Sequence, residues 1–262
     1  MSDVVTFTDG AHWYERDGTP AYTRLTKDGR ERNTTLRDAR KENLFPSVTT
    51  ILGILRAPFL ERWKLENLLV ASLTLPRMDG EDEQSYAHRV WEDAQSVGQK
   101  ATGFGSRYHD LAELRLRLGS LDRVTVDEDL ADYAPHLNRW CEDNIEEVGD
   151  QEFTVVGDPG FAGRVDAYVK HRTHGWVYMD WKTQNVKGGK PNFYDKWVQQ
   201  LAAYRHADKR DGGILSVVID SNEPAPLVEK LWSEDECDHA LETFLATTHL
   251  WQLINKYKPE LT

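Results

Sequence analysis

The sequence predicts an α/β fold, in which a mixed β-sheet is flanked by helices and a mostly helical lobe is attached at the N-terminal end. Three short β-rich segments separated by turn signals occupy the middle of the chain. A continuous apolar run at 214–219, typical of a buried strand, follows them after an intervening helix. This order of elements is most simply packed as one sheet covered by helices.

The composition is that of a globular chain. Hydrophobic residues make up 39% of the 262 residues and charged residues 29%. No apolar run approaches the roughly 18 residues of a membrane span, and the first residues lack the basic and apolar stretches of a secretory signal. We therefore expect a cytoplasmic protein without a membrane partner. Two cysteines are too few for a disulfide scaffold or a four-cysteine iron–sulfur cluster within this chain.

The first hundred residues are expected to form the attached lobe. Asp-Gly turns at residues 9, 17 and 28 suggest hairpins, and Ser47 is a candidate N-cap. Apolar residues at near-helical spacing predict helices over 58–74 and 83–99. We accordingly expect an N-terminal hairpin and helical lobe over 1–100 and a core over 101–262.

The core elements follow in order along the rest of the chain. Helical periodicity predicts helices over 104–118 and 127–148, before the pattern changes to strands. The remaining segments are three strands, a helix, two strands and a final helix, expected at 151–157, 163–171, 175–183, 192–208, 214–219, 227–232 and 233–257.

Charge is distributed unevenly along the chain. The net charge is −12, which argues against a protein that coats nucleic acid without regard to sequence. Residues 151–212, however, contain ten Lys and Arg against seven Asp and Glu, a net charge of +3. Because acidic segments flank this basic window, we expect the functional residues to lie within it.

Two carboxylates and an amine are expected to meet on the predicted meander. Side chains alternate along a strand, so Asp180 and Lys182 share a face with Cα atoms roughly 6.5–7 Å apart. Antiparallel pairing with the preceding strand would bring Asp166 across from Asp180. Carboxylates held close together repel unless a cation lies between them, and Mg²⁺ commonly binds carboxylates together with phosphate oxygens. This set suits phosphodiester hydrolysis.

Helices on either side of the meander supply further candidates. His109 and Glu113 are four residues apart and share a helical face, and a neutral imidazole can complete a metal site. Gln200 and Tyr204 have the same spacing in the helix that follows.

These motifs, in this order, resemble those of the PD-(D/E)XK nuclease superfamily. The matching patterns are Gly105…His109, Gly163-x-x-Asp166, Asp180-x-Lys182 and Gln200-x-x-x-Tyr204, which together are similar to the RecB-like exonuclease branch, in its phage type without an iron–sulfur cluster. The resemblance implies a restriction-endonuclease-like core and a Mg²⁺- or Mn²⁺-dependent DNA exonuclease.

The resemblance also implies a role for each matching residue. Asp166, Asp180, His109 and the Trp181 carbonyl would bind the metal, and Lys182 would position or activate the attacking water. Gln200 and Tyr204 would contact the substrate or steady the site. Beside these motifs, we expect Arg164, Lys187 and Lys190 to contact the DNA backbone, while Glu113 and Glu152 would support the metal ligands from behind.

The implied substrate is single-stranded DNA or DNA ends, in recombination, repair or phage DNA processing, with a possible recombination partner protein. Two alternatives stay open: a structure-specific endonuclease of the same fold, and a nuclease-like binding protein without turnover. Oligomeric state and cleavage polarity are not indicated by the sequence.

Overall fold

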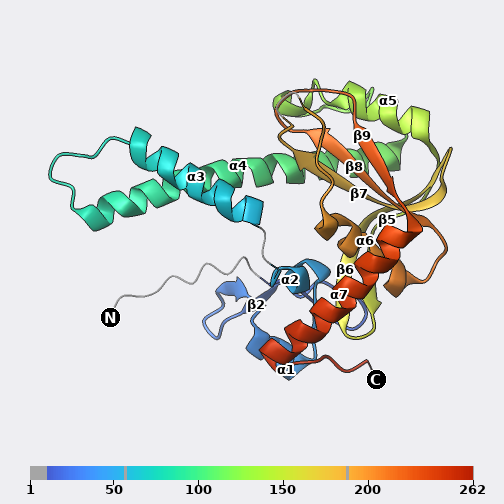
Figure 1. Cartoon of the computed structure of the whole chain (residues 1–262), viewed down its shortest axis with the longest axis horizontal. Coiled ribbons are helices and arrows are strands. Elements are labelled where there is room, and N and C mark those ends of the chain that lie inside the picture. The colour runs from blue at the N-terminus through green and yellow to red at the C-terminus, as the bar shows by residue number, and fades with distance from the viewer. Residues whose placement is uncertain (1–10, 56–57, 187–188, 262) are drawn as a thin grey trace.

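The computed structural model of the chain describes residues 11–55, 58–186 and 189–261. Its centre is one mixed sheet of five strands (Figure 1), whose order is β5 (Ile145–Gly157), β6 (Phe161–His171), β7 (Gly175–Gln184), β8 (Gly213–Asp220) and β9 (Val228–Trp232). The α/β architecture expected from the sequence is therefore confirmed.

The sheet contains an antiparallel meander and one parallel step. β5, β6 and β7 pair antiparallel in sequence order, as the closely spaced turn signals predicted. β7 and β8 pair in parallel, and α6 (Asp195–Asp208) makes the crossover between them. β9 returns antiparallel to β8 at the edge of the sheet.

Helices cover both faces of the sheet (Figure 1). α6 and α7 (Glu234–Asn255) pack on one face, around a buried cluster that includes Leu201 and Phe244. The second half of α4 (Glu83–Leu118) and α5 (Ala134–Asn144) cover the other face, where Trp181 and Met179 are buried. Polar side chains on the central strands therefore lie inside the molecule.

The helices expected at 83–99 and 104–118 are one continuous helix, α4, of 36 residues. At 1.5 Å per residue it is about 54 Å long. The joining sequence Lys100-Ala101-Thr102-Gly103 contains no proline, and a single glycine does not end a helix. The expected boundary at residue 100 consequently falls inside α4.

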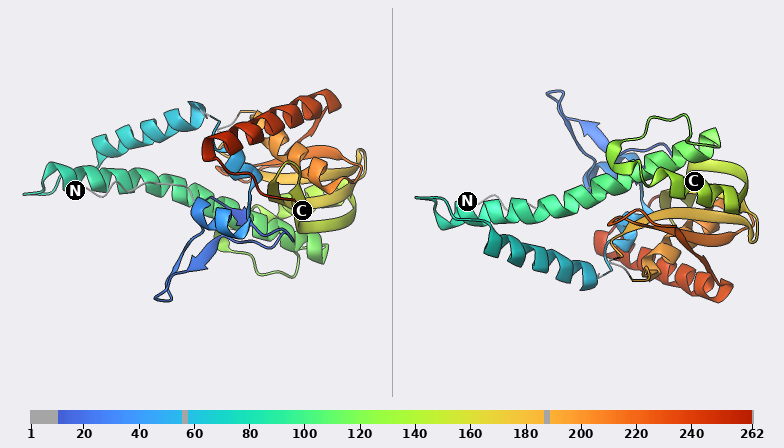
Figure 2. Two further views of the ribbon diagram at one scale, coloured as in Figure 1. Left: turned by 90° about the horizontal axis from the view of Figure 1, so that it is seen from below. Right: turned by 90° about the horizontal axis from the view of Figure 1, so that it is seen from above.

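The first half of α4 leaves the sheet and pairs with α3 (Pro58–Thr74), which was expected over the same residues. Together they form an arm that projects from the sheet in both views of Figure 2. We call α3 and the first half of α4 the helical arm.

Within residues 11–55, the buried side chains pack on the sheet rather than with the helical arm. Trp13 and Ile51 are buried in the same cluster as α6 and α7. The Asp28-Gly29 turn joins a hairpin as expected, whereas Asp9-Gly10 lies outside the described residues. The elements of this segment are β1 (Trp13–Tyr14), β2 (Thr23–Leu25), β3 (Glu31–Asn33), α1 (Leu36–Glu42), β4 (Phe45–Pro46) and α2 (Val48–Leu52).

The prediction of one long helix over 127–148 was wrong at both ends. A 3-10 turn, η1 (Glu128–Leu130), precedes α5, and Pro135 lies in the first turn of α5. β5 begins at Ile145, which pairs with His171 of β6, because a β-branched residue suits the sheet better than a helix end. Within the described ranges, no helix is long and apolar enough to cross a membrane.

Candidate active site

Asp166 and Asp180 lie where β6 and β7 separate. The ladder between these strands ends at the pair Ala167–Met179, and the two aspartates are the next residues on each strand. Trp181 donates its main-chain N–H to Asp166 Oδ2 at 3.0 Å, in place of a bond to the neighbouring strand. The separation of the strands thus brings two carboxylates together inside the sheet.

Asp180 is a buried acid with a basic neighbour. Only 2% of it is exposed, and burial raises its pKa to about 6, although the charge of Lys182 works against that rise and the charge of Asp166 adds to it. Lys182 Nζ forms an ion pair with Asp180. Lys182 therefore stabilises the ionised form of Asp180 without fully offsetting the effect of burial.

His109 reaches the same place from α4. Its Nδ1 lies 3.3 Å from Asp166 Oδ2. Burial would lower the pKa of His109 and raise that of Asp166, but their mutual attraction outweighs burial, so the His109 pKa is raised and the Asp166 pKa is lowered. One turn earlier, a Cβ at Gly105 would lie 3.0 Å from Thr183 Oγ1. Gly105 therefore allows α4 to lie close to β7.

Gln200 and Tyr204 form a chain behind Lys182. Lys182 Nζ donates to Gln200 Oε1 at 3.2 Å, and Gln200 Nε2 donates to the Tyr204 hydroxyl at 3.0 Å. The Tyr204 ring occupies the space beside Gly163, where a Cβ would meet Cε1 of the ring at 2.2 Å. Burial raises the pKa of Tyr204 well above its ordinary value. These contacts fix the position of the lysine.

Glu152 brings a third acid to the site. It lies between Gln151 and Phe153, which pair with Ala167 and Val165 on either side of Asp166, and it has a left-handed backbone, with φ of 51°. Its pKa is raised to about 7, chiefly by burial and also by the charge of Asp166, while the charge of Arg164 opposes both. Arg164 forms an ion pair with Glu152. Glu152, expected to support the metal ligands, and Arg164, expected to contact the DNA backbone, are therefore paired with each other.

The other expected residues are less closely joined to the site. Glu113 pairs with Arg117 at 3.4 Å, and its charge contributes to the raised pKa of Glu152. Lys190 is exposed. Lys187 lies outside the described residues.

Trp197 is a neighbour of the site that lies outside the sequence motifs. Lys182 Nζ lies 6.0 Å from the centre of its ring, within range of a cation–π contact. Trp197, Gln200 and Tyr204 follow one another at three- and four-residue spacing on α6, so they share a helical face. This spacing is the feature of the sequence that could have identified Trp197 as a neighbour of the site.

Comparison of this chain with family models and with curated proteins gives no match. The geometry of the site and the order of its motifs therefore indicate the function of this chain.

Proposed function

We propose that this chain is a Mg²⁺- or Mn²⁺-dependent deoxyribonuclease with a restriction-endonuclease-like core, and that it acts as an exonuclease. The observation that carries the proposal is the pair of carboxylates, Asp166 and Asp180, held where two strands separate, each in contact with a basic side chain. The same residues are those of the motifs that resemble the PD-(D/E)XK superfamily.

The donor set suits a hard divalent cation. Asp166 and Asp180 supply carboxylate oxygens, His109 supplies an imidazole, and the Trp181 carbonyl is a further candidate ligand. The raised pKa of Asp180, which comes chiefly from burial, supports a place for a cation because positive charge there would favour the ionised acid. A bound divalent ion would polarise a phosphate oxygen and acidify water.

Lys182 is placed to act on the reacting atoms. Asp180 and Gln200 hold its amine at the edge of the carboxylate pair. From there Lys182 can orient a water or stabilise negative charge that develops on the phosphate. Glu152 and Glu113 would support the metal ligands, and Arg164, Lys187 and Lys190 would contact the DNA backbone.

The exonuclease mode and its setting rest on the resemblance alone. We propose DNA ends or single strands as substrate, in recombination, repair or phage DNA processing, with a recombination protein as a possible partner. A structure-specific endonuclease would use the same residues and would differ in cutting circular DNA.

We expect the purified chain to degrade end-labelled linear DNA in Mg²⁺ or Mn²⁺, and to leave circular single-stranded DNA intact. Lys182→Ala and Asp180→Asn should each lower the rate by at least about 100-fold, because each removes a charge placed for the transition state. Cleavage is measured on gels with single- and double-stranded substrates.

Lys170→Ala is the matched control. Lys170 lies on β6 and pairs with Glu146 at 2.8 Å on the surface, so its loss should leave the rate unchanged. Full activity in both active-site variants would contradict the assignment. Absence of any metal-dependent cleavage, together with capture of a partner protein, would favour the non-catalytic alternative.

A further inference from the structure

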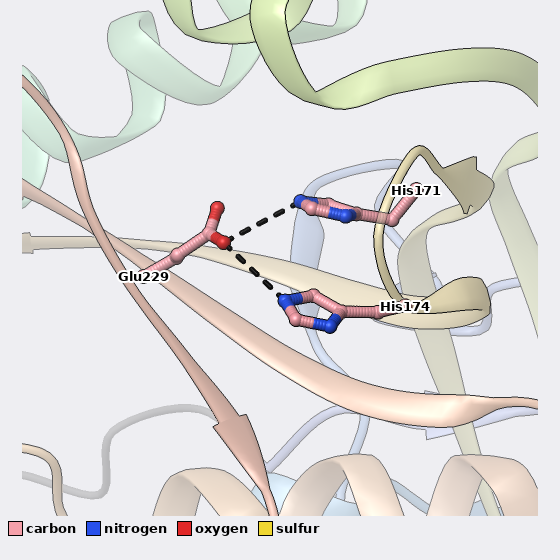
Figure 3. A group of neighbouring side chains, drawn as sticks. All are labelled: His171, His174 and Glu229. Atoms are coloured by element: carbon pink, nitrogen blue, oxygen red, sulfur yellow. Dashed lines mark ion pairs between the residues drawn. The ribbon is translucent and has the colours of Figure 1, made fainter.

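A second group of side chains converges at the other end of β6. His171 ends β6, His174 lies in the turn to β7, and Glu229 comes from β9 (Figure 3). Glu229 Oε1 lies 3.4 Å from His171 Nε2 and 3.6 Å from His174 Nε2. All three ligand atoms lie within 4.8 Å of one another.

His171 is buried without a hydrogen bond at the nitrogen that faces this group. It is 1% exposed, and its Nε2 has no hydrogen-bond partner of good geometry in the described part of the chain. A neutral imidazole is the form that binds metals.

We propose that His171, His174 and Glu229 form a binding site for a first-row transition metal ion, with Zn²⁺ as its reference ligand. Tetrahedral zinc with bonds of about 2.0–2.1 Å places neighbouring ligand atoms roughly 3.3 Å apart. The two nitrogen-to-oxygen distances, 3.4 and 3.6 Å, are close to that separation. The site differs in chemistry from the carboxylate pair, because two imidazoles select zinc over magnesium.

Neighbouring groups are placed to orient these ligands. Trp140 Nε1 donates to the other carboxylate oxygen of Glu229 at 2.9 Å. Thr173 Oγ1 lies 3.0 Å from His171 Nδ1 and can accept a hydrogen bond from the Nδ1–H when Nε2 binds an ion. The Thr173 main-chain N–H, which donates to Nδ1 at 3.2 Å, would then release that bond. Such outer contacts are a regular feature of histidine metal sites.

The site is separate from the nuclease residues and joins distant parts of the sheet. His171 is five residues from Asp166 along β6, or roughly 16 Å of strand. β6 and β9 are not neighbours in the sheet order. A bound ion would therefore tie the β6–β7 turn to the edge strand. His174 and Glu229 have side chains 28% and 26% exposed, which leaves the ion a path from solvent.

The test is zinc binding by the full chain after removal of metal with a chelator. Isothermal titration with Zn²⁺ and the visible absorption of Co²⁺ should show one ion per chain at this site. His174→Ala and Glu229→Gln should each weaken zinc binding by at least about tenfold. Circular dichroism checks that each variant is folded, and the use of two variants, one in the β6–β7 turn and one on β9, guards against one that is not.

Two controls locate the ion. His249→Ala removes an exposed histidine from α7, and His109→Ala removes the imidazole of the nuclease site; both should keep the zinc bound near His171. The proposal is overturned if the wild-type chain binds no zinc, if His174→Ala and Glu229→Gln both bind it as the wild type does, or if only His109→Ala loses it.

Discussion

At the scale of single residues, Asp180 and Lys182 form an ion pair where charge is costly. Both lie in the protein interior, with side chains 2% and 19% exposed, and removing one member of such a pair leaves the other without compensation. We therefore prefer Asp180→Asn to Asp180→Ala as a test variant, because the amide retains the shape and can still accept a hydrogen bond from Lys182.

Gly163 is a residue whose replacement we expect to act through Tyr204. In Gly163→Ala the new methyl group would overlap the tyrosine ring, so the ring must move, and Gln200 loses its partner. We expect a loss of about 1–3 kcal/mol in unfolding free energy, as for other overpacked cores, together with reduced nuclease activity. Urea unfolding and the cleavage assay measure the two effects.

Gly103→Ala is the control for that prediction. Gly103 lies in α4, and the nearest atom to its added Cβ is the end of Arg107, 3.8 Å away. Alanine favours helix over glycine by about 1 kcal/mol, so this variant should be as stable as the wild type or more so. Equal stability of Gly163→Ala and the wild type would show that the site tolerates the methyl group.

Cys141 makes stability depend on pH in the alkaline range. Burial raises the pKa of its thiol to about 12, whereas the thiol of an unfolded chain ionises near 8.5. Above that pH the unfolded state loses a proton that the folded state keeps, so stability falls as pH rises, by up to about 1.4 kcal/mol per pH unit. Urea unfolding between pH 7 and 10.5 should show this.

Cys141→Ala separates the thiol from other groups that titrate in that range. The difference in unfolding free energy between wild type and variant should be constant below about pH 8 and should shrink at higher pH. Parallel profiles across the whole range would contradict a buried, protonated thiol.

At the scale of elements, α4 belongs to two parts of the molecule. Its second half covers the sheet and places His109 in the candidate active site. Its first half pairs with α3 in the helical arm, where large apolar side chains such as Leu69 and Leu73 are exposed. Few contacts to the sheet stabilise that half, so we expect the helical arm to open locally more often than the core.

Tyr86→Phe tests how the helical arm is held together. The Tyr86 hydroxyl lies 2.9 Å from the Ser72 carbonyl and 3.1 Å from the Leu75 carbonyl, near the end of α3. Loss of a hydrogen bond of about 1 kcal/mol should speed amide exchange in this part of α3 roughly fivefold. Hydrogen-exchange mass spectrometry should find β6 and β7 unchanged, because the helical arm contributes no buried side chain to the sheet clusters among the described residues.

Faster exchange that extends into β6 and β7 would mean that the helical arm and the sheet unfold together. Tyr22→Phe is a suitable companion variant, because the Tyr22 hydroxyl donates to that of Tyr14, at 2.7 Å, in the segment packed on the sheet. It should leave exchange in α3 unaltered.

At the scale of the whole molecule, acidity and a DNA substrate are compatible because the charge is localised. The net charge of −12 comes from segments outside 151–212, the window that holds Asp166, Asp180 and Lys182. Acidic surroundings oppose binding along a long stretch of DNA, so contact should be confined to the site.

We therefore expect DNA binding with a shallow salt dependence. Each neutralised phosphate contributes a slope of about −0.7 to −0.9 to log K against log salt. With Arg164, Lys187 and Lys190 as contacts, the slope should be roughly −2 to −3. Fluorescence anisotropy of labelled DNA with Asp180→Asn measures binding without cleavage, and a slope near −10 would indicate a much larger basic surface.

Local patterns predicted most of the elements of the core. Alternation and turn residues located β5, β6 and β7, and the apolar run at 214–219 located β8, because these signals act over a few residues. Errors occurred where the local signal was ambiguous. Nothing between residues 99 and 104 distinguishes a loop from the middle of α4, and the apolar stripe of α5 continues by chance into Ile145.

The sequence by itself determined the alternation that puts Asp180 and Lys182 on one face and the spacing that puts Gln200 and Tyr204 on one helix. Only the tertiary structure decided that Asp166 and Asp180 meet where β6 and β7 separate, that the buried side chains within residues 11–55 pack on the sheet, and that Glu229 approaches His171 and His174. The physical reason is one of range: dihedral preferences and side-chain periodicity act between near neighbours, whereas the twist of a sheet and the burial of its faces depend on segments far apart in the chain.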